Sequence, residues 1–208
     1  LSIRRQRQMC IKRQLIDLAA AIAGGQEAAV RGGAATVVEL QVPVEWVEEL
    51  VLQSVLTVGW PRTLSAAATW REVSGLPAPS NDPGAMPSFA GEWEARGEVT
   101  CRKVYGINYD RLRSNVRALH PALDQWMVTE GYGRTLSRLG LDLRRRELCT
   151  VAQCAVQGAI PQLHSHLRGA LHAGADAEDL RAAVDAARPH TSIASMLAAT
   201  QLLERVLS

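Results

Sequence analysis

Two copies of one pattern occur in this chain, and no other feature constrains its fold as strongly. The clearer copy occupies residues 146–175, and a weaker copy lies near the amino end. Glu147 and His166 of the clear copy are replaced by Gln14 and Gly33 in the weak copy. Self-similarity of this kind indicates a structural unit that is used twice. We therefore expect a tandem repeat in which only the second unit carries these two titratable side chains.

The spacing within the two copies agrees without a gap. Gln14 and Glu45 are thirty-one positions apart, and so are Glu147 and Glu178. The match therefore extends across a helical hairpin and the turn that follows it. Both copies are expected to share the same helices and turn lengths in this region.

The hydrophobic pattern predicts an all-α fold. Alanine, leucine and arginine dominate, and apolar residues recur with a helical period rather than alternating. With 208 residues and 47% hydrophobic content, the chain can bury a sizeable core. Helices are expected at residues 4–30, 44–58, 62–74, 108–118, 121–137, 144–157, 161–173, 177–187 and 191–207.

A segment rich in proline, glycine, serine and asparagine separates the copies. It runs from Gly75 to Gly97 and is predicted to be a linker, because these residues do not sustain helical hydrogen bonding. The predicted organisation is a degenerate first repeat over residues 1–75, a linker over 76–106 and a second repeat with the intact motif over 107–208.

Charge and apolar content argue against two classes of partner. The 23 basic and 21 acidic residues nearly balance, so no footprint for nucleic acid is expected. The basic cluster 144–146 is short and is predicted to be a solvated helix face. No apolar run approaches the roughly 18 residues that a membrane span requires. Neither a polyanion site nor a transmembrane segment is therefore expected.

Cysteine usage indicates reduced thiols and a cytoplasmic location. A chain this long and this rich in alanine does not resemble a disulfide-stapled secreted scaffold. The basic amino end before residues 15–23 imitates a signal peptide, but the repeat requires that apolar stretch as core. The four cysteines are Cys10, Cys101, Cys149 and Cys154.

The clear copy carries a family resemblance. Its motif consists of Arg146, Glu147, Leu148, Gln162, Leu163, His166, Arg168, Gly169, Ala170, Leu171 and Gly174. This motif resembles the core of the carboxymuconolactone decarboxylase family, relatives of alkyl hydroperoxidase D. In the first copy, Gln53, Gly59, Trp60 and Pro61 resemble a further element of that family. The resemblance implies an all-helical unit that assembles as trimers or hexamers, so a duplicated chain would form a homotrimer resembling the hexamer.

One branch of the family is a thiol peroxidase. The resemblance places its Cys-x-x-Cys pair on Ala159 and Gln162, so both thiols are absent here. Peroxide reduction by this route needs one thiolate to attack and a second thiol to resolve the sulfenate. The peroxidase mechanism therefore does not operate at this place.

The decarboxylase branch works by proton transfer, which needs an acid and a base in a sheltered site. The resemblance assigns these catalytic roles to Glu147 and His166. We expect a cofactor-free enzyme that acts on a small carboxylated or lactone-like metabolite.

Hairpin geometry predicts a gap between these two side chains. With a rise of 1.5 Å per residue, Glu147 lies about 16 Å from the hairpin tip and His166 about 8 Å. Direct contact would then need a water or another residue between them. Cys154, two turns after Glu147, is expected near the level of His166 and is a candidate for substrate binding; core packing is the alternative.

Three further residues are candidates for substrate binding. Tyr132 and Arg134 precede the motif and offer a phenol donor and a guanidinium for a substrate carboxylate. Gln162 lies within the motif. No metal site is expected, because His164 and His166 point about 200° apart on a helix and no cluster has ligand spacing.

Two alternatives to this enzyme remain. One is a non-catalytic trimeric scaffold or small-molecule binding protein that retains the hairpin for packing. The other is a thiol-dependent hydroperoxidase that uses Cys149 or Cys154, although these residues are five positions apart and face different sides of a helix.

Overall fold

The computed structural model describes the backbone of residues 3–86 and 89–208 and the side chains from residue 10 onward, except those of residues 83, 87 and 88. The basic side chains before residue 10, which gave the signal-like amino end, lie outside the described residues. All regular structure in the described ranges is helical, which confirms the predicted all-α fold. The helices are α1 (Ile3–Gly24), α2 (Glu27–Glu39), α3 (Val44–Ser74), α4 (Ala90–Tyr105), α5 (Tyr109–Leu119), α6 (Pro121–Trp126), a π-helix (Met127–Leu136), α7 (Leu143–Gln157), α8 (Ile160–His172), α9 (Ala177–Asp185) and α10 (Ile193–Leu207), with 3₁₀ turns at Pro83–Ala85, Gly106–Asn108 and Arg188–His190.

The first three helices differ in their boundaries from the predicted ones. The helix expected over residues 4–30 ends at Gly24, because Gly25 has a left-handed backbone with φ 74°. The two helices expected over 44–58 and 62–74 are both present within the range of α3, and the non-helical backbone of Gly59 (φ 72°, ψ 174°), two residues before Pro61, separates them.

The predicted linker is shorter than expected, because α4 occupies its second half. Gly97 was interpreted as a loop residue but lies inside this helix. A side-chain carbon there would clash with the carbonyl of Val128, and one on Gly133 would clash with the carbonyl of Trp93. These glycines let α4 and the π-helix pack backbone against backbone. Glycine is needed at both positions because any larger residue would prevent this close approach.

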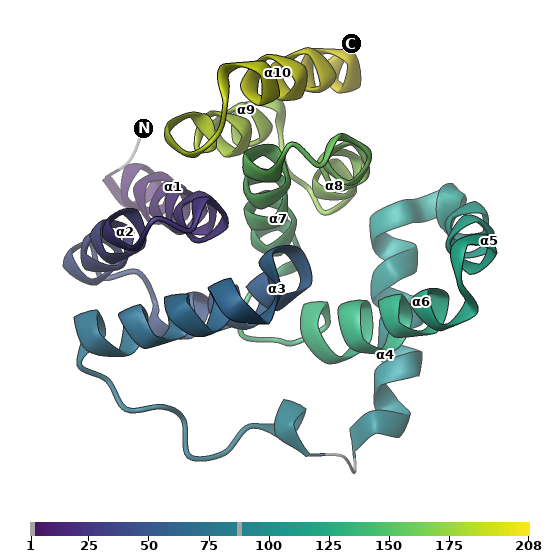
Figure 1. Cartoon of the computed structure of the whole chain (residues 1–208), viewed down its shortest axis with the longest axis horizontal. Helices are drawn as coiled ribbons and strands as arrows, with labels where there is room; N and C mark the ends of the chain where they lie inside the picture. Colours follow the sequence, from purple (N-terminus) through teal and green to yellow (C-terminus); the bar gives the residue numbers. More distant parts are fainter. Residues whose placement is uncertain (1–2, 87–88) are drawn as a thin grey trace.

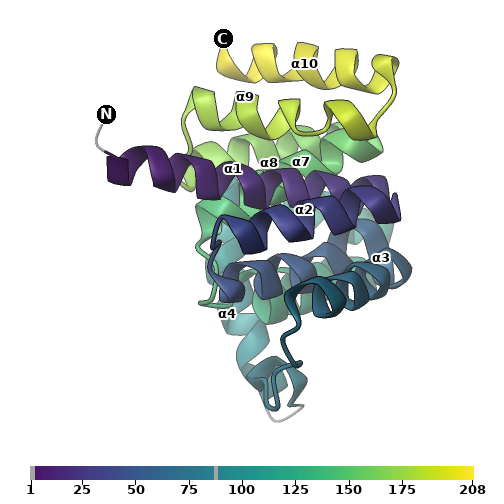
Figure 2. The same ribbon diagram turned by 90° about the vertical axis from the view of Figure 1, so that its left-hand side faces the viewer.

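One large apolar core joins both ends of the chain. It draws its buried residues from α1, α2, α3 and α7 to α10, and α1 packs against α7. Figure 1 shows α7 in the middle of the molecule, with α4, α5 and α6 on the side away from α1 and α2. Figure 2 shows α10, α9, α1, α2 and α3 in successive rows. A smaller cluster around Cys101, Tyr109 and Leu136 holds α4, α5 and the π-helix together. In the described ranges, no helix is both long and apolar enough to cross a membrane.

Backbone geometry recurs at a spacing of 133 positions. Gly25 and Gly158, which end α1 and α7, have φ values of 74° and 64°. Gln41 and Gly174, which follow α2 and α8, have φ values of 54° and 91°. By the same spacing, α9 and α10 correspond to the two parts of α3 on either side of Gly59.

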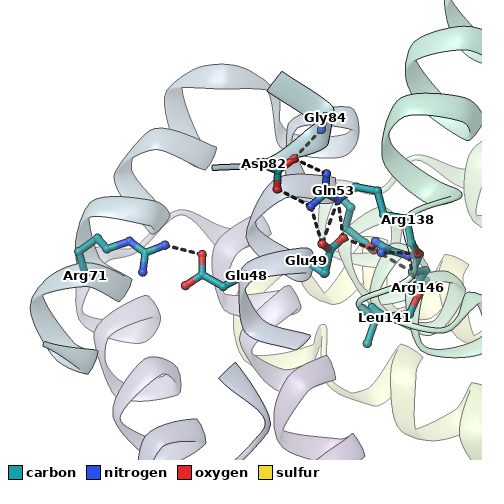
Figure 3. Close-up of polar contacts among 9 residues, drawn as sticks. All are labelled: Glu48, Glu49, Gln53, Arg71, Asp82, Gly84, Arg138, Leu141 and Arg146. Carbon is teal, nitrogen blue, oxygen red and sulfur yellow. Dashed lines mark hydrogen bonds and ion pairs between the residues drawn. The ribbon is translucent and has the colours of Figure 1, made fainter. Parts of the chain in front are cut away.

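A buried ion-pair network fixes α7 to α3 (Figure 3). The guanidinium of Arg146 is fully buried and donates to Oε2 of Glu49 at 2.6 Å and to Oε1 of Gln53 at 3.2 Å. Arg138 bridges Glu49 and Asp82 at 2.7 Å each, which ties the linker to the same cluster. The prediction that 144–146 form a solvated face is therefore wrong for Arg146, because its charge is neutralised by a partner from the first half of the chain.

Candidate active site

Glu147 of α7 and His166 of α8 are in direct contact. Oε2 of Glu147 lies 2.8 Å from Nδ1 of His166. The Glu147 side chain is fully buried, whereas 15% of the His166 side chain is exposed. The carboxylate therefore lies inside the protein and the imidazole connects it to the surface.

The expectation of a gap between these side chains is wrong, and Cys154 does not bridge them. A side-chain carbon on Gly169 would lie 2.6 Å from Oε2 of Glu147. The carboxylate thus lies against the residue one turn after His166, on the same face of α8. Counting along the helix axes locates the backbone but omits the reach of a glutamate side chain across the hairpin.

The contact assigns different roles to the two imidazole nitrogens. When the Glu147 carboxyl is ionised it can only accept a hydrogen bond, and Nδ1 of His166 then carries the hydrogen. In the neutral ring, Nε2 is then an unprotonated acceptor on the opposite side. In this arrangement a buried acid orients a histidine that can act as a base.

The other oxygen of the Glu147 carboxylate is unsatisfied. Within the described chain, Oε1 is buried and has no hydrogen-bond partner. An unmade hydrogen bond at a buried acceptor costs about 1–3 kcal/mol, so such atoms are rare without a functional reason. Oε1 therefore keeps an unused acceptor position inside the protein.

Two tyrosines lie beside the pair. The rings of Tyr105 in α4 and Tyr132 in the π-helix pack edge to face, with centroids 6.1 Å apart. Burial raises the pKa of Tyr105 to about 12 and that of Tyr132 well above its usual value, and the nearby charge of Glu147 acts in the same direction. Both phenols are thus protonated at neutral pH, and the two side chains are hydrogen-bonded to each other. Tyr132 was a sequence candidate, but Tyr105 was missed because it falls in the predicted linker.

Two thiols share this environment. Cys101 of α4 and Cys154 of α7 are buried, and burial raises the pKa of each to about 12, with a further contribution from the charge of Glu147. Cys154 is therefore near Glu147, but as a protonated thiol rather than a nucleophilic thiolate.

Arg134 does not reach this region, contrary to prediction. Its Nε donates to the carbonyl of Gly84 at 3.1 Å, and its guanidinium stacks on Trp93 at 5.1 Å from the ring centroid. Arg134 is two residues from Tyr132, so the two side chains leave the helix in different directions. Gln162 is exposed on α8.

The site therefore combines a buried carboxylate, an imidazole that reaches the surface and two protonated phenols. Within the ranges that the structure covers, no three His, Cys, Asp or Glu side chains are grouped in a way that could hold a metal ion. These features define an all-helical protein with a carboxylate–imidazole pair at a helical hairpin. Residues 121–205, which include the pair, match the model of the carboxymuconolactone decarboxylase family. The match leaves out the amino-terminal half.

Two relatives are similar to parts of the chain. Peroxisomal protein 2 of Schizosaccharomyces pombe (strain 972 / ATCC 24843) is 29% identical over 138 residues, which are 65% of this chain and 63% of the relative. An uncharacterized 15.0 kDa protein in the nqo9-nqo10 intergenic region of Paracoccus denitrificans is 39% identical over 64 residues, or 30% of this chain and 48% of the relative. The chain thus spans less than two thirds of each relative.

Proposed function

We propose that this chain is a carboxymuconolactone decarboxylase-like enzyme that uses Glu147 and His166 for acid/base chemistry. The 2.8 Å contact between these two residues, inside the segment that matches the family, carries the proposal. The proposed substrate is a small carboxylated or lactone-like metabolite, and no cofactor takes part.

In the proposed reaction, His166 transfers the proton through Nε2 and Glu147 orients the imidazole. When a carboxylated substrate loses CO₂, the bond between its carbon and the carboxylate breaks and the electron pair stays with that carbon. The protonated His166 delivers a proton to this carbon and regains one from solvent. Where that carbon is conjugated to a carbonyl of the substrate, part of the negative charge moves onto the carbonyl oxygen, and the hydroxyl of Tyr105 stabilises it by donating a hydrogen bond.

A metabolite screen read by thermal shift, followed by turnover of the stabilising ligand, tests this proposal. His166→Ala should lower turnover by about 10²–10⁴-fold, the usual contribution of a general acid or base. His164→Ala, two residues away on an exposed site of α8, is the matched control and should retain full turnover. Unchanged turnover in His166→Ala would contradict the proposal.

We also propose that the chain is a duplicated unit. Its first copy does not carry the acid/base pair, because Gln14 and Gly33 stand at the positions of Glu147 and His166. Support comes from the left-handed positions that recur 133 residues apart. Contacts recur as well. A side-chain carbon on Gly25 would meet Arg62, and one on Gly158 would meet Ser195, which is 133 positions after Arg62.

We further propose a cytoplasmic homotrimer that resembles a hexamer of single units. Exposed apolar side chains support an interface between copies, because Trp60 and Leu64 of α3 correspond by position to the exposed Ile193 and Leu197 of α10. Light scattering after size exclusion would give the mass. Since one relative is named a peroxisomal protein, imaging of the tagged chain should compare cytoplasm with peroxisomes.

The alternative is a non-catalytic scaffold or small-molecule binding protein. The complete burial of Glu147 favours it, because a sealed carboxylate also serves packing. Ligand binding without turnover in the metabolite screen would support this alternative. A thiol-dependent hydroperoxidase ranks third; it predicts thiol-dependent peroxide consumption that Cys154→Ser abolishes.

A further inference from the structure

A charged groove lies between α1, α7 and α9. Its volume is about 560 Å³, and neither residue of the acid/base pair lines it. Four cationic side chains line it, namely Lys12, Arg13, Arg144 and Arg145. A cavity of this size is in the usual range for small-molecule sites, about 300–1,000 Å³.

The groove exists because α9 carries smaller side chains than the corresponding part of α3. At the spacing of 133 positions, Asp179 corresponds to Trp46 and Ala182 to Glu49. On the α3 side, the guanidinium of Arg145 lies over the ring of Trp46, 4.0 Å from its centroid. On the α9 side, the smaller Asp179 and Ala182 line an open groove.

The two sides also differ in the hydrogen-bond acceptors that they offer to an arginine of the neighbouring helix. Arg146 is neutralised by the carboxylate of Glu49 at 2.6 Å and bonded by the amide oxygen of Gln53 at 3.2 Å. The residues that correspond to Glu49 and Gln53 are Ala182 and Ala186. The α9 side has therefore lost both acceptors.

Arg13 corresponds by position to Arg146 and lines the groove together with Ala182. Its side chain is 50% exposed, and its Nε lies a long 3.7 Å from Oδ1 of Asp17. Arg13 thus retains the cation of the network while its strong carboxylate partner is missing.

Three acidic residues line the groove, and two of them have partners within the chain. Asp179 pairs with both Lys12 and Arg144, and their hydrogen bonds hold its pKa below the usual value although burial acts in the opposite direction. Asp176 caps the first turn of α9, and Glu178 is exposed. A carboxylate entering the groove therefore meets a half-exposed Arg13, whose partner within the chain is the long 3.7 Å pair with Asp17 one helical turn away.

We propose that this groove binds a small carboxylate-bearing molecule, whose carboxylate pairs with Arg13 as that of Glu49 pairs with Arg146. The inference rests on the proposed repeat and not on the acid/base reaction. His166→Ala should therefore leave binding intact, which separates failure of this inference from failure of the proposed activity.

Isothermal titration calorimetry of the full chain with succinate and citrate tests the proposal. Arg13→Gln should weaken binding about tenfold, because it removes the guanidinium that pairs with the carboxylate of the ligand. Arg111→Gln removes an exposed arginine of α5 and should leave the affinity unchanged. Ala182→Glu supplies an internal carboxylate at the position of Glu49, so it should abolish binding and raise the melting temperature.

Three results would overturn the inference. One is the lack of saturable binding of either carboxylate at millimolar concentration. Another is equal affinity in the wild type, Arg13→Gln and Ala182→Glu. The third is tighter binding of inorganic phosphate than of either carboxylate with the same loss in Arg13→Gln, which would assign the groove to phosphate instead.

Discussion

Gly169 lies directly against the carboxylate of Glu147. A side-chain carbon at this glycine would come within 2.6 Å of Oε2 of Glu147, and equally close to Cγ1 of Val104. Three helices, α4, α7 and α8, therefore meet at a point that has no room for a methyl group. The position of the Glu147 carboxylate depends on this glycine.

Gly169→Ala should consequently displace the carboxylate and lower turnover while the protein stays folded. Overpacking costs about 1–3 kcal/mol, and the better helix propensity of alanine offsets up to about 1 kcal/mol of that cost. Urea unfolding should show a net loss on the order of 1 kcal/mol. Gly32→Ala is the control, because nothing lies within 4 Å of the added carbon in α2; it should stabilise the protein.

Glu49→Ala should destabilise the protein strongly. It leaves the fully buried Arg146 without its carboxylate, and an uncompensated buried charge costs about 3–5 kcal/mol. Denaturant unfolding measures this loss. Glu72→Ala removes the carboxylate of an exposed pair with Arg31, so its unfolding midpoint should stay near the wild-type value. Similar midpoints for both variants would contradict the importance of burial.

Acid unfolding should depend on Asp124. Hydrogen bonds from Arg113, followed by those from Arg117, hold the pKa of this carboxyl below its usual value. Its contribution is therefore complete above the unfolded pKa of about 3.9 and is lost as the pH falls towards the folded pKa. The stability difference between wild type and Asp124→Asn should shrink over this range. A difference independent of pH would contradict this; Asp110→Asn, at an exposed site, is the control.

Thiol labelling should separate one cysteine from the other three. Cys10 is exposed, whereas burial raises the pKa of Cys101, Cys149 and Cys154 to about 12. Ellman's reagent at neutral pH should titrate one thiol in the native protein and four after unfolding in guanidinium. Cys10→Ser should lose the fast reaction. A second fast thiol in the native state would instead favour the hydroperoxidase alternative.

The hairpin of the second half was predictable because its ends carry local signals. Asp142 caps α7, Gly158 ends it in a left-handed conformation and Pro161 stands in the first turn of α8. The predicted ranges 144–157 and 161–173 differ by one residue from the observed ones at three of the four ends.

Helix α4 was missed although it contains a helical period. Its buried residues Trp93, Gly97, Cys101 and Val104 recur every three or four positions. The proline-rich stretch before this helix and the glycine within it favour a loop, so the sequence predicts a linker there despite the helical period. Tyr105, at the end of this helix, was lost as a site residue with it.

The burial of Arg146 could not be predicted from its neighbours. Three arginines stand in a row, but only Arg146 meets Glu49, a partner 97 positions away. Arg144 reaches Asp179 instead and is 39% exposed. Local patterns do not contain such long-range pairings, and they likewise could not show that Glu147 and His166 touch.

The path of the chain between its halves has a practical consequence. Residues 75–81 form an exposed connection, while α1 and α7, which it separates in sequence, share one core. A protease that cuts this connection would leave two fragments whose apolar faces complete each other. The protein therefore suits a split reporter, in which two separately expressed pieces regain their helical packing only when they meet.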